Sequence, residues 1–326
     1  MSTQTPPAET LLSIGNLSVQ FNVPGRGQLR AVDNVSLDLR KGETLGLVGE
    51  SGCGKTTLGR AILRLNRPAA GSIAWRGQDH AGVDLPRSIQ MVFQDPYSSL
   101  NPRMTIGAIV GEPLRSLSLA RGKAAEERVV QLMEQVGLDP RLRTRFPGQL
   151  SGGQRQRTGI ARALAAKPEL IVADEPIAAL DVSIQAQILN LLENLRVELG
   201  LTYLFISHDL RAVRYLADRI AVMYLGELVE LGSAKEVGQR PLMPYTRALM
   251  DAAPSLSGHR QRMVLTSDIP SPMNPPSGCR FRTRCPYAIA DCSHAKPPLQ
   301  EIAPGHFAAC IRIGPEQPDI TEAAGQ

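Results

Sequence analysis

GESGCGKTT occupies residues 49–57 and directly follows the apolar run TLGLVG of residues 44–49. The stretch matches the pattern G-x-x-x-x-G-K-S/T, which requires a buried strand before it and a helix after it. Its glycines let the backbone curl, so that N–H groups and the helix N-terminus face phosphate oxygens. Lys55 can then pair with the β- and γ-phosphates, while the Thr56 hydroxyl ligates Mg²⁺. The stretch predicts a nucleotide-binding P-loop, formed by Gly49, Ser51, Gly52, Cys53, Gly54, Lys55, Thr56 and Thr57.

A second apolar run, LIVAD of residues 170–174, ends in Asp174 and is followed at once by Glu175. Ligands of open α/β sheets bind at the carboxyl ends of the strands. There, one carboxylate can reach Mg²⁺ and the next can polarise a water for in-line attack. We therefore expect Asp174 to ligate the metal and Glu175 to be the catalytic base. A helix cap before Pro176 is the alternative interpretation.

A third motif, LSGGQ, places Ser151, Gly152 and Gly153 before the apolar helical pattern TGIARALAA. A serine followed by two glycines at a helix start can bind phosphate through its hydroxyl and the backbone N–H groups. An ordinary helix N-cap is the alternative.

The chain has 326 residues, of which 43% are hydrophobic and 21% charged, so collagen-like, coiled-coil and wholly disordered chains are excluded. No apolar stretch is long enough to cross a membrane, and the polar opening MSTQTPPAET lacks the features of a secretory signal. We therefore expect a cytosolic protein. The net charge of +5 suits nucleic acid, an anionic membrane or nucleotides, or reflects a solvated surface. Aromatic residues at 4% disfavour a single-strand nucleic-acid binder.

Apolar segments alternate with helical patterns up to about residue 240, which indicates a parallel sheet with covering helices. Residues 203–207 read as a further buried strand, and residues 11–21 and 31–42 alternate as antiparallel strands would. A hairpin is expected to turn at Gly226–Glu227. The last 86 residues hold 13 of the 25 prolines, which indicates a second, loop-rich unit. The expected division is 1–250, with a helical subdomain at about 95–166, and 251–326.

These motifs, in this order, together with MVFQDP at 91–96, ALDVS at 179–183 and SHDL at 207–210, resemble those of the ATP-binding subunits of ABC transporters. The resemblance covers residues 11 to about 240. It implies an α/β P-loop NTPase with an antiparallel β-subdomain and a helical subdomain. It also implies roles for Gln94 as a sensor of Mg²⁺ and the attacking water, and for His208 as a switch histidine at the γ-phosphate. Asp181 would contact the opposite subunit, and Phe21 would stack on adenine.

The resemblance further implies that two chains sandwich ATP, each lending the loop from Ser151 to Gln154 to its partner's P-loop. One departure from the family pattern is the pair Ile177 and Ala178, where a Thr or Val and then a Ser are usual. Neither position is a phosphate ligand, so hydrolysis of ATP is still expected.

Four of the five cysteines, Cys279, Cys285, Cys292 and Cys310, fall within 32 residues. Disulfides are disfavoured in a reducing cytosol. Four thiolates can hold structural Zn²⁺ or a 4Fe-4S cluster, and spacing alone does not choose between them. Four unrelated buried thiols are the remaining alternative.

The tail, residues 251–326, resembles the C-terminal extension of ATPase subunits in bacterial oligopeptide, dipeptide and nickel importers, in particular the F-type subunit. In that family, four such cysteines are associated with a 4Fe-4S cluster. The resemblance therefore implies such a cluster on these four cysteines, with Zn²⁺ as the alternative. Arg280, Arg282 and Arg284 would offset its negative charge, or are solvated surface residues. His294 and His306 rank below the thiolates as ligands.

The same resemblance implies a subunit that powers peptide import from the cytoplasmic face of the inner membrane, as a peripheral protein. Its expected partners are a D-type ATPase in a heterodimer, two transmembrane permease subunits and, through them, an extracytoplasmic peptide-binding protein. Import of nickel or another solute is an alternative. A soluble ABC ATPase acting on nucleic acid is disfavoured, because the P-loop and LSGGQ are separated by a short segment without a coiled coil.

Overall fold

The computed structural model describes residues 9–252 and 268–314, which pack as two units. The helical unit contains the described residues up to Leu11, Leu39–Glu43 and Gln78–Ile206. The P-loop unit contains Leu12–Asp38, Thr44–Gly77 and the described residues from Ser207 onward. The boundary expected at residue 250 stays a prediction.

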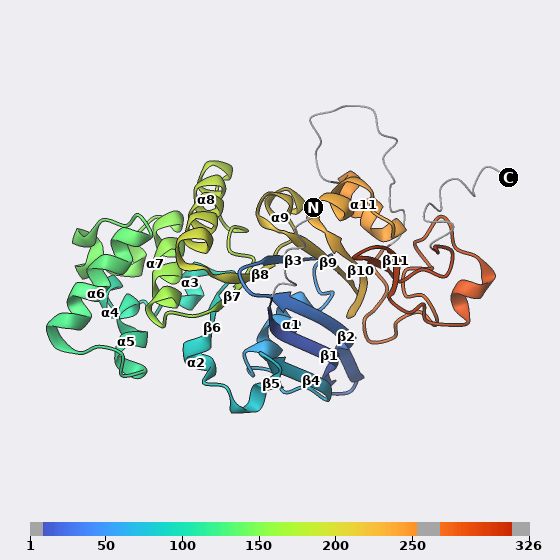
Figure 1. Cartoon of the computed structure of the whole chain (residues 1–326), viewed down its shortest axis with the longest axis horizontal. Coiled ribbons are helices and arrows are strands. Elements are labelled where there is room, and N and C mark those ends of the chain that lie inside the picture. Colours follow the sequence, from blue (N-terminus) through green and yellow to red (C-terminus); the bar gives the residue numbers. More distant parts are fainter. Residues whose placement is uncertain (1–8, 253–267, 315–326) are drawn as a thin grey trace, which may run out of the picture. The chain divides into compact units, whose positions relative to one another are not determined.

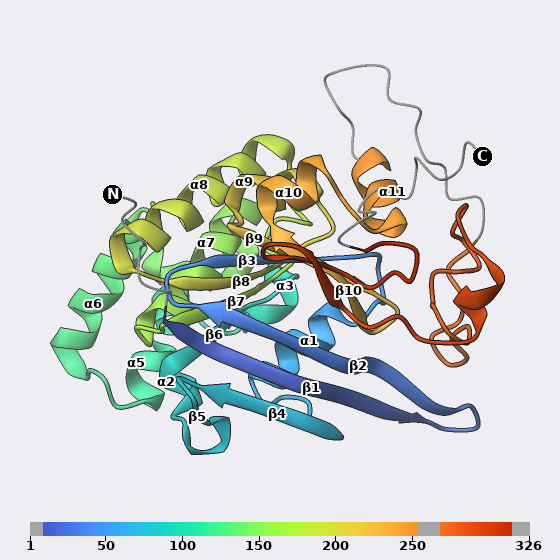
Figure 2. The ribbon, with the colours of Figure 1, turned by 45° about the vertical axis from the view of Figure 1, so that its right-hand side comes forward.

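Long antiparallel strands form one sheet of the P-loop unit, in the order β2-β1-β4 (Figures 1 and 2). Their bounds are β1 Thr10–Val23, β2 Gly27–Arg40 and β4 Ala70–Trp75. Leu12 of β1 lies opposite Trp75 of β4. Along β2, Val35, Leu37 and Leu39 are buried while the residues between them are exposed. One face of this sheet is therefore wet, as the alternating sequence predicts.

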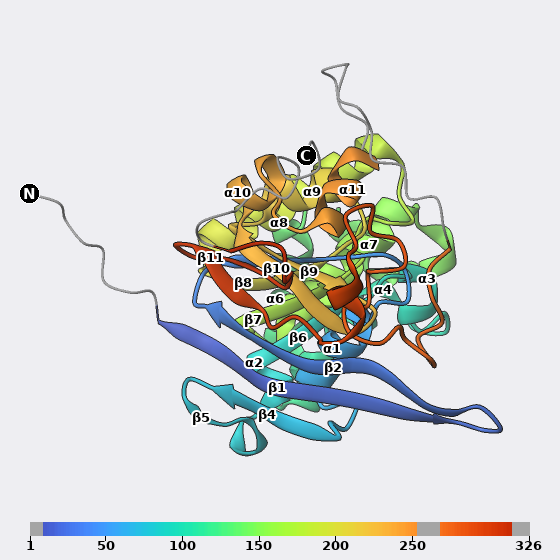
Figure 3. The same ribbon diagram turned by 90° about the vertical axis from the view of Figure 1, so that its right-hand side faces the viewer.

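The P-loop unit also holds strands in the order β11-β12-β10-β9-β3. Figure 3 shows β9, β10 and β11 of this sheet. Strand β3 (Thr44–Val48) is fully buried and runs parallel to β9 (Arg219–Tyr224). Strand β10 (Glu227–Ser233) returns antiparallel, so the hairpin turns at Leu225–Gly226, one residue earlier than expected. The tail strands β11 (Gln300–Ala303) and β12 (His306–Ala308) extend this sheet beside β10. The helices of this unit are α1 (Lys55–Ile62), α9 (Leu210–Leu216), α10 (Ala234–Gln239), α11 (Pro244–Ala252) and a 3-10 turn at Ala290–Ser293.

The helical unit contains a parallel sheet in which β7 (Leu170–Asp174) lies between β6 (Ile89–Val92) and β8 (Thr202–Ile206). Every residue of β7 and β8 is buried. A strand buried on both faces reads as a continuous apolar run, so the sequence locates these two strands to within one residue.

Helices make up most of the remaining helical unit (Figure 1). The longest, α8 (Val182–Leu199), ends at Gly200, whose φ of 65° is the left-handed conformation that ends a helix. Pro140 and Pro147 begin 3-10 turns, since proline fits the first position of a helical turn. The other elements are β5 (Gln78–Asp79), 3-10 turns at His80–Gly82, Pro140–Thr144 and Pro147–Gln149, α2 (Leu85–Ser88), α3 (Pro96–Ser99), α4 (Ile106–Val110), α5 (Glu112–Ser116), α6 (Gly122–Gln135) and α7 (Gly152–Ala165). Across residues 9–252 and 268–314, no helix is long and apolar enough to span a bilayer.

Candidate nucleotide site

The P-loop follows β3 and requires glycine at two positions. Gly54 has a φ of 106°, and a Cβ there would lie 2.0 Å from the carbonyl oxygen of Ala31. A Cβ at Gly49 would lie 2.2 Å from the carbonyl oxygen of Met223. Because both neighbours are backbone atoms, neither can rotate away. The loop therefore curls tightly, and helix α1 begins at Lys55 with Gly54 as its N-cap.

Lys55 lies back across its own loop. Its side chain is buried, at 6% exposure, and Nζ donates to the carbonyl oxygens of Gly49 at 2.7 Å and Glu50 at 3.1 Å. The ammonium is thus held inside the curve of the loop, where a phosphate would enter. Burial raises the pKa of the Cys53 thiol, so Cys53 is a small loop residue and not a nucleophile.

His208 belongs to the same unit as the P-loop. The preceding residue, Ser207, donates its backbone N–H to Leu47 O at 3.1 Å, which holds this segment beside the end of β3. The His208 side chain is exposed. Asp209 then caps α9, its Oδ1 accepting from Arg211 N at 2.9 Å. Phe21, on β1, is 39% exposed.

The acidic pair lies in the helical unit, at the carboxyl end of β7. Asp174 is 2% and Glu175 7% exposed. Glu175 has a φ of 49°, and its N–H donates to Ile206 O at 2.9 Å on the neighbouring strand. A left-handed conformation at a non-glycine residue costs free energy and is concentrated at functional sites. The left-handed conformation of Glu175 therefore makes this strand end a candidate functional site.

The LSGGQ motif forms the start of α7. Ser151 Oγ accepts from Gln154 N at 3.3 Å, while Gln154 Oε1 accepts from Ser151 N at 3.0 Å. This reciprocal pair is a capping box, so the ordinary N-cap interpretation also holds. Gly153 is needed for packing, because a Cβ there would lie 2.7 Å from Cγ2 of Ile184 on α8.

Two further predicted site residues, Gln94 and Asp181, lie in the helical unit. Gln94 is exposed just after β6, and Asp181 is exposed at the N-cap position of α8. Gln185 braces the loop before Asp181, since its Nε2 donates to the carbonyl oxygens of Ile177 at 3.2 Å and Leu180 at 3.0 Å. The sequence did not predict a role for Gln185, because its contacts with Ile177 and Leu180 form only when the loop has folded against α8.

The predicted site residues divide between the two units. The P-loop unit holds Phe21, residues 49–57 and His208. The helical unit holds Gln94, residues 151–154, Asp174, Glu175 and Asp181. The meeting of these two sets around one nucleotide stays a prediction.

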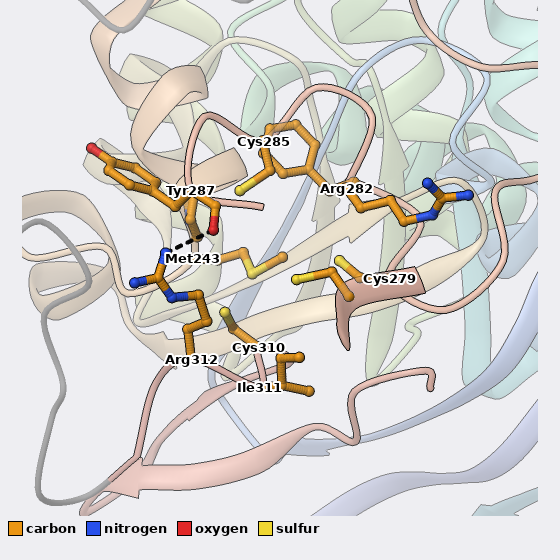
Figure 4. A pocket seen from close by; sticks show the side chains of 11 residues that line it. Met243, Cys279, Arg282, Cys285, Tyr287, Cys310, Ile311 and Arg312 are labelled. Atoms are coloured by element: carbon orange, nitrogen blue, oxygen red, sulfur yellow. Dashed lines mark hydrogen bonds between the residues drawn. The ribbon is translucent and has the colours of Figure 1, made fainter. Parts of the chain in front are cut away.

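The four tail cysteines line one small cavity, together with Met243 and Tyr287 (Figure 4). Its volume is about 20 Å³, which is room for roughly one water molecule. Arg312 donates to Tyr287 O at 2.8 Å beside it.

The prediction of a 4Fe-4S cluster on Cys279, Cys285, Cys292 and Cys310 is wrong, and so is its Zn²⁺ alternative. Within the part of the chain that the structure describes, no group of three or more His, Cys, Asp or Glu residues is placed to hold a metal ion. Burial raises the pKa of Cys279 and Cys285 to about 11 and also raises that of Cys310, so these thiols are protonated at neutral pH.

The other residues assigned to that cluster have different partners. His306 Nε2 lies 2.8 Å from Oε1 of the fully buried Glu230, and His294 is exposed. Arg280 and Arg284 pair with carboxylates outside the cysteine cavity. Neither arginine is therefore a solvated surface residue.

We expect Cys279 and Cys285 to react slowly with iodoacetamide at neutral pH. With a pKa of about 11 for Cys279 and Cys285, roughly one thiol in a thousand is ionised at pH 8. Alkylation should accelerate about tenfold per pH unit between pH 8 and 10, as mass spectrometry of these peptides would measure. Urea-unfolded protein is the control. Rates in the folded chain that equal those of unfolded protein at pH 8 would contradict the burial of the thiols.

The sequence matches the family model for ABC transporters over residues 32–178 and the model for the oligopeptide/dipeptide transporter C-terminal region over residues 229–292. It is 51% identical to the putative oligopeptide transport ATP-binding protein YkfD of Bacillus subtilis, over 92% of this chain and 94% of that protein. The chain belongs to the oligopeptide family of ABC transporter ATP-binding proteins. It is also 49% identical to the oligopeptide transport ATP-binding protein OppF of Salmonella typhimurium, over 94% of this chain and 97% of that protein.

Solved structures agree with this family. A dimeric ATP-binding cassette in a post-hydrolysis state, bound to ADP and Pi, covers 69% of this chain with a TM-score of 0.62 at 31% identity, over 99% of its own length. A component of an ABC transporter complex of Clostridium perfringens covers 72% of this chain and 92% of its own, with a TM-score of 0.62 at 26% identity. The predicted fold class, an α/β P-loop NTPase of the ABC type, is confirmed for this cassette.

Proposed function

We propose that this chain binds and hydrolyses ATP to power the import of di- or oligopeptides through an ABC transporter. The observation that carries the proposal is full-length similarity to oligopeptide transport ATP-binding proteins, which extends beyond the cassette into the C-terminal region. The P-loop geometry supports nucleotide binding, because a buried Lys55 and a helix N-terminus converge on one concave loop.

In the proposed site, Lys55 turns from its own carbonyl oxygens to the β- and γ-phosphates. Oxygen donors suit Mg²⁺, and we assign Thr56, Asp174 and Gln94 to hold it. When bound, Mg²⁺ neutralises charge that develops on the phosphates. Glu175 polarises the attacking water, while His208 touches the γ-phosphate and Phe21 stacks on adenine.

Two ATPase subunits would complete each site, with Ser151, Gly152, Gly153 and Gln154 of one facing the P-loop of the other. The exposed Ser151 hydroxyl at the start of α7 suits a phosphate oxygen, because a helix N-terminus favours negative charge. Asp181 would contact the opposite subunit. The proposed partner is a D-type ATPase, in a heterodimer that closes on ATP and reopens after hydrolysis.

The proposed heterodimer works at the cytoplasmic face of two membrane permease subunits, as a peripheral protein. An extracytoplasmic binding protein would deliver the peptide to these permeases. The proposed function requires no contact between the solute and this chain.

The test is ATP hydrolysis by the assembled transporter in lipid nanodiscs, with and without the binding protein loaded with peptide. Stimulation by a peptide-loaded binding protein, and by no other loaded solute, is the expected result. Stimulation by a nickel complex instead would replace the substrate but keep the transporter. Hydrolysis that responds to nucleic acid and to no permease would overturn the proposal.

A further inference from the structure

The C-terminal tail contacts the P-loop through an ion pair between Arg284 and Glu50. The Arg284 guanidinium makes a bidentate contact with the Glu50 carboxylate, with Nη1 2.7 Å from Oε2 and Nη2 3.0 Å from Oε1. The Arg284 side chain is 5% exposed and that of Glu50 is 21% exposed. The two parallel N–H···O contacts are largely shielded from water. They fix both the relative orientation and the separation of the Arg284 and Glu50 side chains. Glu50 is the second residue of the P-loop, directly after Gly49.

The backbone of Glu50 is also held by hydrogen bonds. Its N–H donates to the Tyr245 hydroxyl of α11 at 2.9 Å, and its carbonyl oxygen accepts from Lys55 Nζ at 3.1 Å. The Tyr245 ring packs on Tyr224 and on Phe281 of the tail, with ring centroids 4.6 and 5.3 Å apart. Glu50 is therefore held at its side chain and at both backbone polar groups.

The tail segment that carries Arg284 is itself anchored. Arg280 bonds to the Asp33 carboxylate of β2, to Leu225 O in the β9–β10 turn, and lies 2.6 Å from Oε1 of Glu227. Lys296 lies 2.8 Å from the same Glu227 oxygen. These contacts fix the tail segment that carries Arg284 to β2 and to the β9–β10 hairpin.

The Glu50 carboxylate presents an electrostatic problem for a phosphate site. An unpaired Glu50 carboxylate in the P-loop would repel the triphosphate of ATP. It would also attract the Lys55 ammonium and so draw Lys55 away from the triphosphate. Arg284 cancels that charge and leaves the Lys55 ammonium for the nucleotide. We propose that Arg284 is a positioning residue of the nucleotide site, through which the C-terminal tail holds Glu50 and sets the affinity of the P-loop for ATP.

This inference rests on the proposed phosphate-binding role of the P-loop. Its test is binding of a non-hydrolysable MgATP analogue to the full-length chain, measured by calorimetry. For Arg284→Gln we expect roughly a tenfold rise in Kd, as for the loss of one charged hydrogen-bond pair. In the assembled transporter, the KM for ATP should rise by a similar factor while kcat changes less than twofold.

Three variants make the outcome specific. Arg284→Lys, which keeps the charge, should recover part of the affinity. The double variant Arg284→Gln, Glu50→Gln removes both charges and should return the Kd to within about twofold of wild type. Arg282→Gln is the matched control, since Arg282 bonds only to Ser277 in the described part of the tail.

Unchanged affinity in Arg284→Gln would overturn the inference, and so would a loss that Glu50→Gln does not recover. Melting temperatures show whether each variant is folded, and if Arg284→Gln does not fold, the double variant and Arg284→Lys carry the comparison. Failure of the wild-type chain to bind the analogue, or unimpaired binding by Lys55→Ala, would instead refute the proposed nucleotide site.

Discussion

Replacing Glu175 with Gln is expected to lower kcat for ATP hydrolysis by about 10²–10⁴-fold, the range for loss of a general base. The amide keeps the size of the side chain but cannot accept a proton from the attacking water. Glu175 follows the buried end of β7 in a left-handed conformation, with a φ of 49°, and is 7% exposed. Its position is thus set by the backbone, so the substitution should change the chemistry and leave the local fold intact.

Phosphate release by the assembled transporter measures this effect, and calorimetry with MgATP measures binding separately. We expect the Kd for ATP to stay within a fewfold of wild type, since Glu175 is assigned no phosphate contact. Glu198→Gln is the matched control, because Glu198 is an exposed carboxylate on α8 in the same unit. A Glu175→Gln protein that hydrolyses ATP as fast as wild type would remove Glu175 from the role of base.

Local sequence patterns predict the strands and the helix starts of this chain well. The runs that become β3, β7 and β8 are continuous and apolar because both faces of these strands are buried. Gly200 ends α8 and Ser151 begins α7 for reasons confined to one or two turns of backbone. Such elements are predictable because the residues that determine them are neighbours in the chain.

Contacts between distant segments were not predictable in the same way. Arg284 and Glu50 lie 234 residues apart, and each alone reads as an ordinary surface charge. The pairing of β12 with β10 and the buried contact of His306 with Glu230 also depend on how the tail returns to the sheet. No periodicity or motif encodes such a return, so the tail's contact with the P-loop emerged only from the structure.

The metal prediction failed for a related reason. Four clustered cysteines indicate ligands by number and spacing, but ligation also needs side chains that the fold places around one metal position. In the described part of the chain, no group of three or more His, Cys, Asp or Glu residues is placed in this way. Number and spacing are sequence properties, whereas the relative placement of the side chains in the fold is not.

Replacing Lys55 with Ala should weaken ATP binding by about 100-fold or more. A hydrogen bond to a charged group contributes about 1.5–3 kcal/mol, and Lys55 is assigned one to each of two phosphates. Since each 1.4 kcal/mol is a factor of about ten, losing both bonds gives this range. The effect on hydrolysis should be at least as large at cellular ATP, because the γ-phosphate also loses its positioned cation.

The Kd of a non-hydrolysable MgATP analogue measures the loss, with Lys41→Ala as the matched control on an exposed lysine. The P-loop should keep its curve in Lys55→Ala, because backbone contacts at Gly49 and Gly54 determine it and Glu50 keeps its Arg284 partner. The loss of affinity would then arise from the missing ammonium and not from a collapsed loop. Wild-type affinity in Lys55→Ala would place the nucleotide outside the P-loop. If the variant instead melts at so low a temperature that unfolding alone accounts for its weaker binding, Lys55 would have a role in the stability of the loop.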